Sequence, residues 1–207
     1  MLSFTKRLSV WVFAAVLGAA FVPAAGAEVY ELDKEHTNIG FAVQHLMLST
    51  TKGEFTDYTG SVTYDPDDLA ASSAELEIKA KSIATKNADR DKHLSGPEFL
   101  DVDKFPTITF KNAKFVKQSD GVAITGDLTI KDVTKKVTLI SKITGPVATP
   151  WGFSAIGIDA QGAINRQDFG VSFNKTLDGG GMVVADEVML QISIEAHKKA
   201  EKPEEKQ

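Results

Sequence analysis

The residues that could perform chemistry in this chain are few and scattered. There is no cysteine among the 207 residues, which excludes a thiol nucleophile and disulfide bonds. The sequence contains neither a Gly-x-Ser-x-Gly elbow nor a glycine-rich phosphate loop. Its acidic residues mostly fall in turns or at outward-facing strand positions. The pattern therefore favours a protein that is not an enzyme, and we expect no catalytic residue.

Histidine is the remaining candidate for metal chemistry. The four histidines are His36, His45, His93 and His197, and none forms the HxH, HxxxH or HExxH spacing that brings two imidazoles to one ion. We therefore expect no metal site and no cofactor of that kind. His45 ends a row of inward-facing residues, where hydrogen bonding at the rim of the fold accounts for it. An accessory redox or hydrolytic enzyme with a metal at His36, His45 and His93 stays open as an alternative, because folding could bring them together.

Strands must position these residues, because most of the chain alternates apolar and polar residues with a period of two. The clearest case is residues 74–81, AELEIKAK. We expect strands at residues 29–33, 38–46, 53–56, 58–64, 74–81, 107–117, 122–131, 136–143, 153–165 and 187–196. We expect turns or short loops at 47–51, 65–68, 119–121, 132–135 and 145–150, and a long polar loop at 165–181.

One segment interrupts the alternation. Residues 85–94 have the composition of a helix, with Thr85 as the expected N-cap and Gly96-Pro97 as the stop. The residues that could face a core are only Ala88, Leu94 and the methylene of Asp91. We therefore expect a short helix that lies on a surface of the β structure.

The number and spacing of the strands limit the architecture. About eight antiparallel strands joined by short turns indicate a sandwich or a closed barrel, which alternation alone cannot separate. An eight-stranded barrel is either packed solid or holds one small ligand. The small inward residues at 80, 126, 160 and 162 favour unfilled volume, although a glycine in a strand equally marks a bend.

The first 27 residues predict export. Lys6 and Arg7 precede an uncharged apolar run at residues 8–22, which is short for a spanning helix, and Ala25-Gly26-Ala27 offers a signal-peptidase site. We expect cleavage after Ala27 and a periplasmic mature chain, with a domain at residues 28–197 and a charged, disordered tail at 198–207. Removing the segment leaves 21 basic against 28 acidic residues, a net charge of −7, which argues against nucleic acid as a partner.

Several segments resemble the family of periplasmic YceI-like proteins. They are Tyr30-Glu-Leu-Asp33 with His36, Phe41-x-Val43-x-His45, Gly53-x-Phe55, Ser82-Ile83, Arg90-Asp-Lys-His-Leu94, Phe99-Leu-Asp-Val, Phe105-Pro106-x-x-x-Phe110, Gly126-Asp-Leu-Thr-Ile130, Val133-Thr134-Lys135 and Asp168-Phe169. The run at 90–94, followed by the phenylalanine motifs, is the most specific. The resemblance covers about residues 29–196, nearly the whole expected mature chain.

The resemblance implies an all-β fold, a lipocalin-like, extended antiparallel eight-stranded β-barrel with a short helical segment near residues 85–94. It also implies that the interior holds a long apolar chain, such as a polyisoprenoid, an isoprenoid quinone or a similar amphiphile, for transport, storage or stress response. It implies no catalysis and no cofactor besides the lipid. The expected partner is therefore a long-chain lipid; transient contact with a membrane or membrane protein, and a monomer or a homodimer, are all compatible with it.

The residues expected to face inward, from the strands and from the helical segment, are then the candidates for the wall of such a cavity. They are Phe41, Val43, His45, Phe55, Leu76, Ile78, Leu94, Phe99, Ile108, Phe110, Leu128, Ile130, Leu139, Ile158 and Ile192. The same residues would simply be core in a solid barrel. A solid barrel that acts through its surface, as a stress or interaction protein, is therefore the third alternative.

Overall fold

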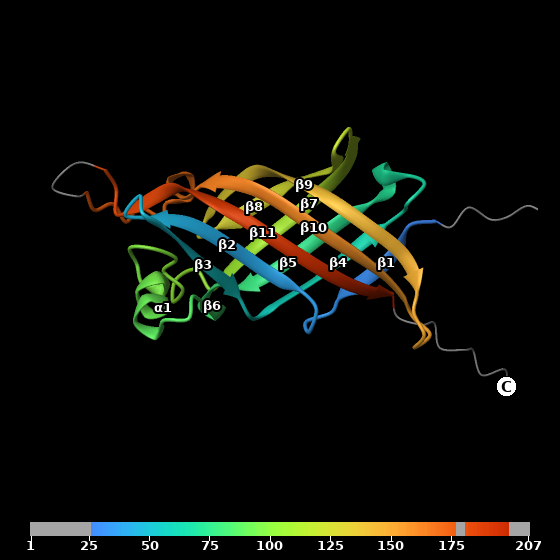
Figure 1. Ribbon diagram of the computed structural model, residues 1–207, viewed down its shortest axis with the longest axis horizontal. Helices are drawn as coiled ribbons and strands as arrows, with labels where there is room; N and C mark the ends of the chain where they lie inside the picture. The colour runs from blue at the N-terminus through green and yellow to red at the C-terminus, as the bar shows by residue number, and fades with distance from the viewer. Residues whose placement is uncertain (1–25, 177–180, 199–207) are drawn as a thin grey trace, which may run out of the picture.

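The computed structural model describes residues 26–176 and 181–198. Within these ranges the chain is mostly antiparallel strand, with one α-helix, α1 (Ala88–Ser95) (Figure 1). The strands are β1 (Glu28–Leu32), β2 (Asn38–His45), β3 (Ser49–Phe55), β4 (Tyr58–Tyr64), β5 (Ser73–Lys79), β6 (Ile83–Ala84), β7 (Thr107–Gln118), β8 (Gly121–Ile130), β9 (Val133–Ala148), β10 (Ser154–Asn165) and β11 (Val184–Lys198).

The strands form a closed, eight-stranded antiparallel barrel, which decides between the barrel and the sandwich. Three of the eight barrel strands are each broken in two, as β1 with β2, β3 with β4, and β5 with β6. Each barrel strand pairs with the next one along the chain. The ring is closed by β11, which pairs with β2 over Val184–Ser193 and with β1 at Ala196 and His197. Closure pairs the two terminal strands, so the wall has no long open edge.

At two of the three breaks, a backbone N–H inside the break donates a hydrogen bond to a neighbouring segment. The N–H of Thr56, between β3 and β4, donates to the carbonyl oxygen of Ser82 at 3.2 Å. The N–H of Asp33, between β1 and β2, donates to the carbonyl oxygen of Glu195 at 2.9 Å. Backbone groups that leave the regular strand pairing thus still have hydrogen-bond partners in neighbouring segments.

Alternation along the strands decides what lies inside the barrel, as the sequence predicts. In β8, Ile124, Leu128 and Ile130 are buried. The intervening Thr125 points outward, where its hydroxyl lies 2.7 Å from that of Thr138 on β9. The apolar face of the strand is therefore buried inside the barrel, and the polar face lies on its outside.

The helix differs from the prediction at its start. It begins at Ala88, and its N-cap is Asn87, whose side-chain oxygen accepts a hydrogen bond from the N–H of Arg90 at 3.0 Å. Thr85 is therefore not the N-cap. It is buried, because the side chains of Arg90 and Asp91 turn back to hydrogen-bond it. Gly96 ends the helix, as predicted.

Three predicted turns are shorter in the structure than in the prediction. The turn at 47–51 is reduced to residues 46–48, and the turn at 132–135 to residues 131–132. The predicted loop at 145–150 is largely strand, since β9 continues to Ala148, which pairs with Ser154 of β10. Pairing with a long neighbouring strand supplies backbone partners that the local turn residues do not reveal.

The predicted polar loop at 165–181 is wrong for its first half. Arg166–Phe169 forms a 3-10 turn, and Phe169, Val171 and Phe173 are buried. These apolar residues alternate with Gly170 and Ser172, so a short period of two is present in a segment that the prediction treats as polar. Residues 177–180 lie outside the described ranges.

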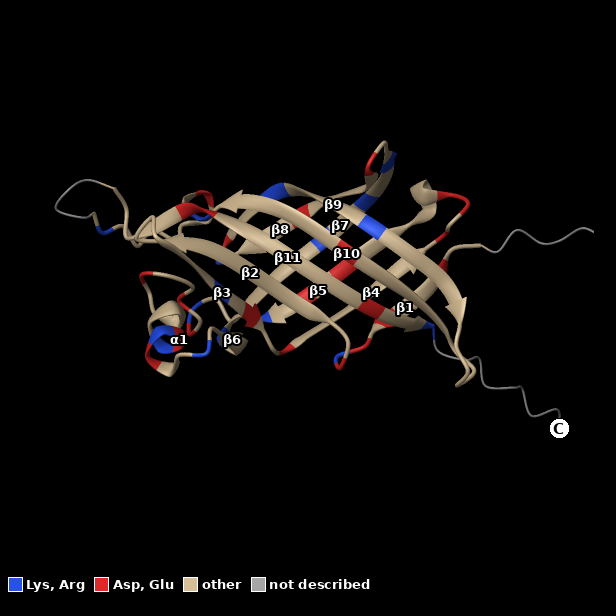
Figure 2. Cartoon of the chain, viewed as in Figure 1, with Lys and Arg blue, Asp and Glu red and all other residues tan. Residues whose placement is uncertain are grey.

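Most residues of the predicted signal peptide and tail lie beyond the described part of the chain. The expected signal peptide up to residue 25 and the tail from residue 199 lie outside the described residues. Lys198, where the tail was expected to begin, is the last residue of β11. In the described part of the chain, no helix has the length and apolar character needed to cross a membrane. Basic and acidic residues are interspersed along the described chain, as the colours of Figure 2 show.

Candidate functional site

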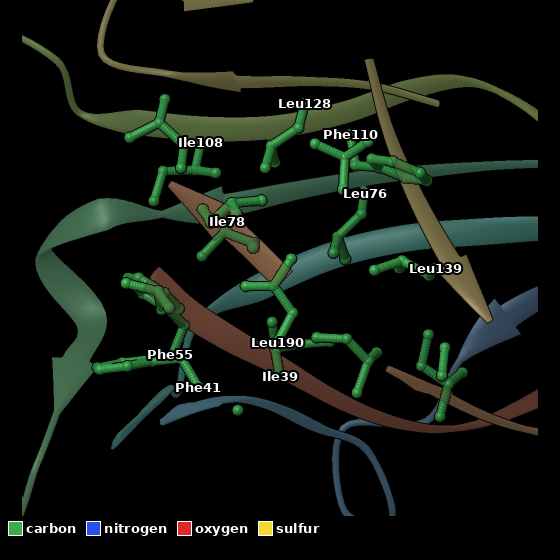
Figure 3. Close-up of a pocket in the computed structure, with 18 of the residues that line it drawn as sticks. Ile39, Phe41, Phe55, Leu76, Ile78, Ile108, Phe110, Leu128, Leu139 and Leu190 are labelled. Atoms are coloured by element: carbon green, nitrogen blue, oxygen red, sulfur yellow. The ribbon is translucent and has the colours of Figure 1, made fainter. Parts of the chain in front are cut away.

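The barrel encloses an apolar cavity of about 230 Å³. It lies between the strands and is lined from most of them, so that side chains distant in sequence face one another across it (Figure 3). Its lining residues are apolar apart from Ser61, Glu75 and Arg166. The surface that these residues present to the cavity is formed almost entirely by apolar atoms. What it offers is a space from which water is readily displaced by hydrocarbon.

The structure places nearly all of the predicted wall residues around this cavity. Those that line it are Phe41, Val43, Phe55, Leu76, Ile78, Leu94, Phe99, Ile108, Phe110, Leu128, Ile130, Leu139, Ile158 and Ile192. Whether they contact a ligand stays a prediction.

His45 is the predicted wall residue that does not line the cavity. It is the last residue of β2, where it pairs with Ser49 of β3 and Val184 of β11. Its side chain continues the inward row that begins at Ile39, and its partner Val184 lines the cavity although His45 does not. Alternation gives only the side of a strand on which a residue lies, so it could not exclude His45.

The structure also adds wall residues to the predicted set. Ile39, Phe115, Ile124, Val137 and Leu190 line the cavity and lie in strands, so a fuller use of the alternation would have found most of them. Arg166, Val171 and Val184 line it as well. The first two belong to the segment taken for a polar loop. Val171 lies in the short alternation of Phe169, Val171 and Phe173, and no sequence period marks Arg166.

Two phenylalanine rings lie over glycines in neighbouring strands instead of filling the cavity. A Cβ added to Gly126 of β8 would lie 2.5 Å from Cζ of Phe110, and one added to Gly53 of β3 would lie 2.4 Å from Cζ of Phe41. The predicted small residue at 126 therefore makes room indirectly. It lets an aromatic ring lie against the wall, which leaves space at the centre.

This arrangement predicts the effect of Gly126→Ala. The new methyl group would push the Phe110 ring toward the cavity, where there is room, so we expect the free energy of unfolding to fall by only about 1 kcal/mol, the low end of the overpacking range. Gly60→Ala is the contrasting change, because its Cβ would lie 2.5 Å from the backbone carbonyl oxygen of Glu75, which cannot turn away. Urea unfolding of both variants measures the difference. Equal losses would indicate that Phe110 has no room to move.

The helical segment closes one end of the barrel. Leu94 of α1 and the following Phe99 line the cavity. Phe99 stacks on Phe173 with ring centroids 4.8 Å apart, and the imidazole of His93 meets both rings edge-on. The N–H of Phe173 also donates to the carbonyl oxygen of Glu98 at 3.1 Å. The helix and the 166–173 segment are thereby packed into one cap.

The motif at residues 90–94 is explained by this cap. The guanidinium of Arg90 donates to the hydroxyl and the carbonyl oxygen of Thr85, at 2.7 and 2.6 Å. The carboxylate of Asp91 accepts from the N–H and the hydroxyl of the same threonine, at 2.9 and 2.5 Å. His93 joins the aromatic cluster and Leu94 reaches the cavity. The motif therefore fixes the position of the cap, and its polar residues are structural.

Arg166 is the buried charge at the cavity. Its side chain donates to the carbonyl oxygens of Val171, Val184 and Ala185, at 2.7, 3.3 and 3.0 Å, and to Oδ1 of Asp186 at 2.9 Å. Burial lowers the pKa of Arg166, and the Asp186 carboxylate opposes that shift. The guanidinium thus ties the 166–171 turn to the start of β11.

The histidines do not form the metal site that was left open. His36 and His93 each pair with a different acid, His36 Nδ1 with Asp33 Oδ2 at 2.5 Å and His93 Nε2 with Glu98 Oε2 at 3.1 Å. His45 lies on the β2–β3 hairpin. The hydrogen bond between the first pair raises the pKa of His36 and lowers that of Asp33. Among the described residues, no group of possible metal ligands contains His36, His45 and His93 together.

Comparison with known proteins agrees with this architecture. A sequence profile for the YceI-like domain matches residues 30–196. A UPF0312 protein of Yersinia pestis (strain Pestoides F) is 42% identical over 183 residues, covering 86% of this chain and 92% of its own.

Solved structures are similar over most of their length. The crystal structure of the Campylobacter jejuni YCEI protein superposes with a TM-score of 0.65 at 34% identity, covering 81% of this chain and 96% of its own. A polyisoprenoid binding domain from Saccharophagus degradans has a TM-score of 0.59 at 13% identity, covering 82% and 98%. At that identity the second similarity shows the fold alone.

Proposed function

This chain belongs to the YceI-like domain family, and from that premise we propose that it binds the hydrocarbon chain of a lipid inside its barrel. A polyisoprenoid, an isoprenoid quinone or a similar amphiphile has the required chemistry. The name of the Saccharophagus degradans domain, a polyisoprenoid binding domain with the same fold, supports this class of ligand.

The observation that carries the proposal is the apolar cavity itself. Ligand affinity there depends on buried hydrocarbon, at roughly 0.8 kcal/mol for each CH₂ group. A dozen chain carbons would contribute on the order of 10 kcal/mol, against about 4–15 kcal/mol for the lost freedom of the two partners. A ligand of about that length or longer is therefore needed for useful affinity, and a charged recognition site is not.

The size of the cavity adds a constraint. Its volume of about 230 Å³ exceeds the roughly 150 Å³ of an engineered apolar cavity that binds benzene, and is below the roughly 300 Å³ at which pockets for drug-sized ligands begin. The space therefore accepts a section of a chain. A long isoprenoid would have to extend through one end of the barrel, or displace side chains such as Phe41 and Phe110 that lie against the wall.

The physiological part of the proposal is transport, storage or stress protection of such a lipid in the periplasm. It is supported by the family and by the apolar run and small-residue site at residues 8–27. Transient contact with a membrane, or with a protein that carries the same lipid, would then supply and remove the ligand. Catalysis has no part in the proposal, which needs only the apolar surface of the cavity.

Native mass spectrometry of protein purified without detergent tests the proposal. We expect a mass increment that organic extraction releases as a lipid. Leu128→Trp is the matching variant: Leu128 is 8% exposed and lines the cavity, so the indole should fill the space, be tolerated, and remove or shorten the bound chain. A solid core would instead lose about 1–3 kcal/mol of stability from overpacking. A wild-type protein without lipid, combined with a destabilised Leu128→Trp variant, would overturn the proposal in favour of a solid barrel.

A further inference from the structure

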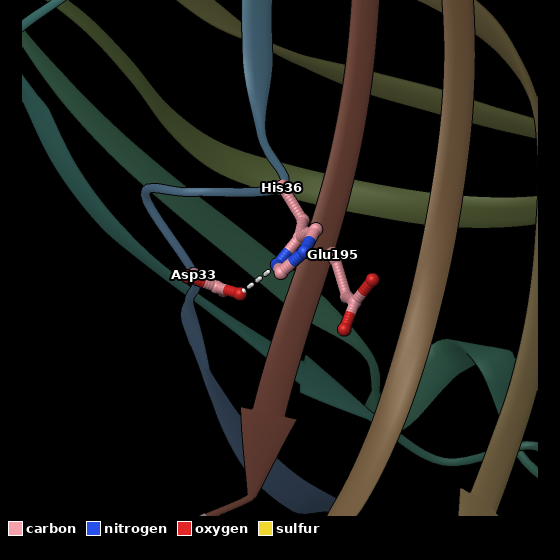
Figure 4. A group of neighbouring side chains, drawn as sticks. All are labelled: Asp33, His36 and Glu195. Atoms are coloured by element: carbon pink, nitrogen blue, oxygen red, sulfur yellow. Dashed lines mark hydrogen bonds and ion pairs between the residues drawn. The ribbon is translucent and has the colours of Figure 1, made fainter.

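We propose that Asp33, His36, Glu195 and His197 form a binding site for a divalent transition-metal ion, with Zn²⁺ as the probe. The site lies on the outside of the barrel, where the break between β1 and β2 meets β11 (Figure 4). It is separate from the lipid cavity, whose lining includes none of these four residues. The inference therefore does not rest on the proposed function.

The first evidence is the distance between possible ligand atoms. One such atom from each of Asp33, His36 and Glu195 lies within 4.8 Å of those from the other two. His197 Nε2 lies 2.7 Å from Oε1 of Glu195 and 3.9 Å from Oδ2 of Asp33. Figure 4 shows His36 between Asp33, to which a dashed line joins it, and Glu195 of β11. Four side chains from two segments of the chain, the β1–β2 break and β11, thus lie close together.

The second evidence is the chemistry of the set. Two imidazoles and two carboxylates are ligands that Zn²⁺ takes in proteins, with metal–ligand distances of about 2.0–2.2 Å. In a tetrahedral site of that size, neighbouring ligand atoms lie about 3.3 Å apart. The His36–Asp33 and His197–Glu195 pairs are now joined by hydrogen bonds at 2.5 and 2.7 Å. A metal ion would replace the proton in each bond after the bonded atoms had moved apart by less than 1 Å. The two pairs would also have to approach each other, which these partly exposed side chains can do.

The third evidence is that the surrounding chain holds the ligands in place, as the outer shell of a metal site does. Oδ1 of Asp33 accepts a hydrogen bond from the N–H of Glu35 at 3.0 Å, which leaves Oδ2 directed at the histidines. The hydroxyl of Thr37 bonds both the carbonyl oxygen and the N–H of Glu195, at 3.2 Å each.

Aromatic packing positions the fourth ligand. The ring of Phe153 lies on the imidazole of His197, with centroids 4.3 Å apart, and Trp151 stacks on Phe153 with centroids 6.1 Å apart. A surface hollow of about 450 Å³, lined in part by Asp33, His197 and these two aromatic residues, gives an ion access from solvent.

The charges around the site favour a cation. With neutral imidazoles the four ligands carry a net charge of −2. The two lysines that border the hollow are each paired with another carboxylate, Lys34 with Asp57 at 3.5 Å and Lys198 with Glu28 at 2.6 Å. A bound ion would link the β1–β2 break to β11 where the barrel closes, at a point where β1 and β11 are paired through only two residue positions. We therefore expect the metal to raise the melting temperature.

Isothermal titration calorimetry with Zn²⁺ tests the site, on protein expressed from the full chain and purified without a polyhistidine tag. We expect one ion per chain, and an affinity that falls at least about 10-fold in His36→Ala and in His197→Ala, because even loss of an outer-shell partner costs 10–100-fold. His45→Ala is the matched control, since it removes a strand-end histidine outside the cluster and should leave the titration unchanged.

Two further measurements separate loss of a ligand from loss of the fold. Circular dichroism in EDTA should show that each variant is folded, and Glu195→Gln offers a ligand change of nearly the same shape should an alanine variant unfold. Zn²⁺ should raise the melting temperature of the wild type and of His45→Ala, and have little effect on His36→Ala, His197→Ala or Glu195→Gln. Absence of binding by the wild type, or binding that survives in all three cluster variants, would overturn the proposal.

Discussion

Ile78→Asp is expected to empty the barrel of its ligand. Ile78 is 5% exposed, lines the cavity and pairs with Tyr58 and Ile108 in the two adjacent strands. An aspartate there must either stay charged against hydrocarbon or take up a proton with a raised pKa, and both cost several kcal/mol in the complex. Each 1.4 kcal/mol is a tenfold change in affinity, so we expect lipid binding to weaken by at least about 100-fold. Native mass spectrometry and lipid extraction measure the loss.

The neighbouring position provides the control. Glu77 lies on the opposite, solvent-exposed face of β5, where its carboxylate forms an ion pair with Lys79 at 2.7 Å. Glu77→Ala should leave both the fold and the bound lipid unchanged. Near-ultraviolet circular dichroism of Ile78→Asp shows whether the barrel persists without ligand. Retention of lipid by a folded Ile78→Asp protein would mean that the ligand lies elsewhere.

Arg166→Met is expected to have the largest effect on stability. The change removes every hydrogen bond that the guanidinium makes to three carbonyl oxygens and to Asp186, while leaving those acceptors in place. Breaking a buried ionic group in this way typically costs about 3–5 kcal/mol. For a domain of this size that corresponds to a fall in melting temperature of roughly 10 °C. Thermal and urea unfolding measure it directly.

Gln167→Ala is the matched control for this prediction. The Gln167 amide donates to the same oxygen, Oδ1 of Asp186, at 3.1 Å, but from a less buried position. Its loss should cost about 1 kcal/mol or less. Arg166→Lys should recover little of the stability, because the compact ammonium group of lysine cannot donate to all four acceptors that the forked guanidinium reaches. A loss below 1 kcal/mol in Arg166→Met would show that the segment is held by the packing of Phe169 and Val171 alone.

Alternation along the chain was sufficient to predict most of the wall. Residues such as Leu76, Ile78 and Leu128 were assigned to the interior because a strand with period two has only two faces, and only one of them here is apolar. The stop of the helix at Gly96 was equally local, since a proline follows it. The family resemblance then supplied the closed barrel, which alternation could not distinguish from a sandwich.

Contacts between distant segments decided the rest. Thr85 looked like an N-cap because threonine often is one, but Arg90 and Asp91 hold it inside the cap, and Asn87 takes the role. Arg166 looked like a loop residue because its four acceptors come from residues 171–186, which local sequence does not place. Which inward-facing residues line the cavity is also a tertiary property, since Val184 lines it and its partner His45 does not.

What the sequence by itself determined is which side of each strand is apolar, because that depends only on the two-residue repeat of a β-strand. What only the tertiary structure decided is where those strands lie against one another. Closure by β11 brings His36 and Asp33 next to Glu195 and His197, some 160 residues later in the chain. The resulting set of possible metal ligands has no spacing in the sequence that would predict it. Closure also leaves an interior space, because Phe110 and Phe41 lie over glycines of adjacent strands. Both features depend on the register between strands, which is fixed by the packing of the whole barrel and not by any one segment.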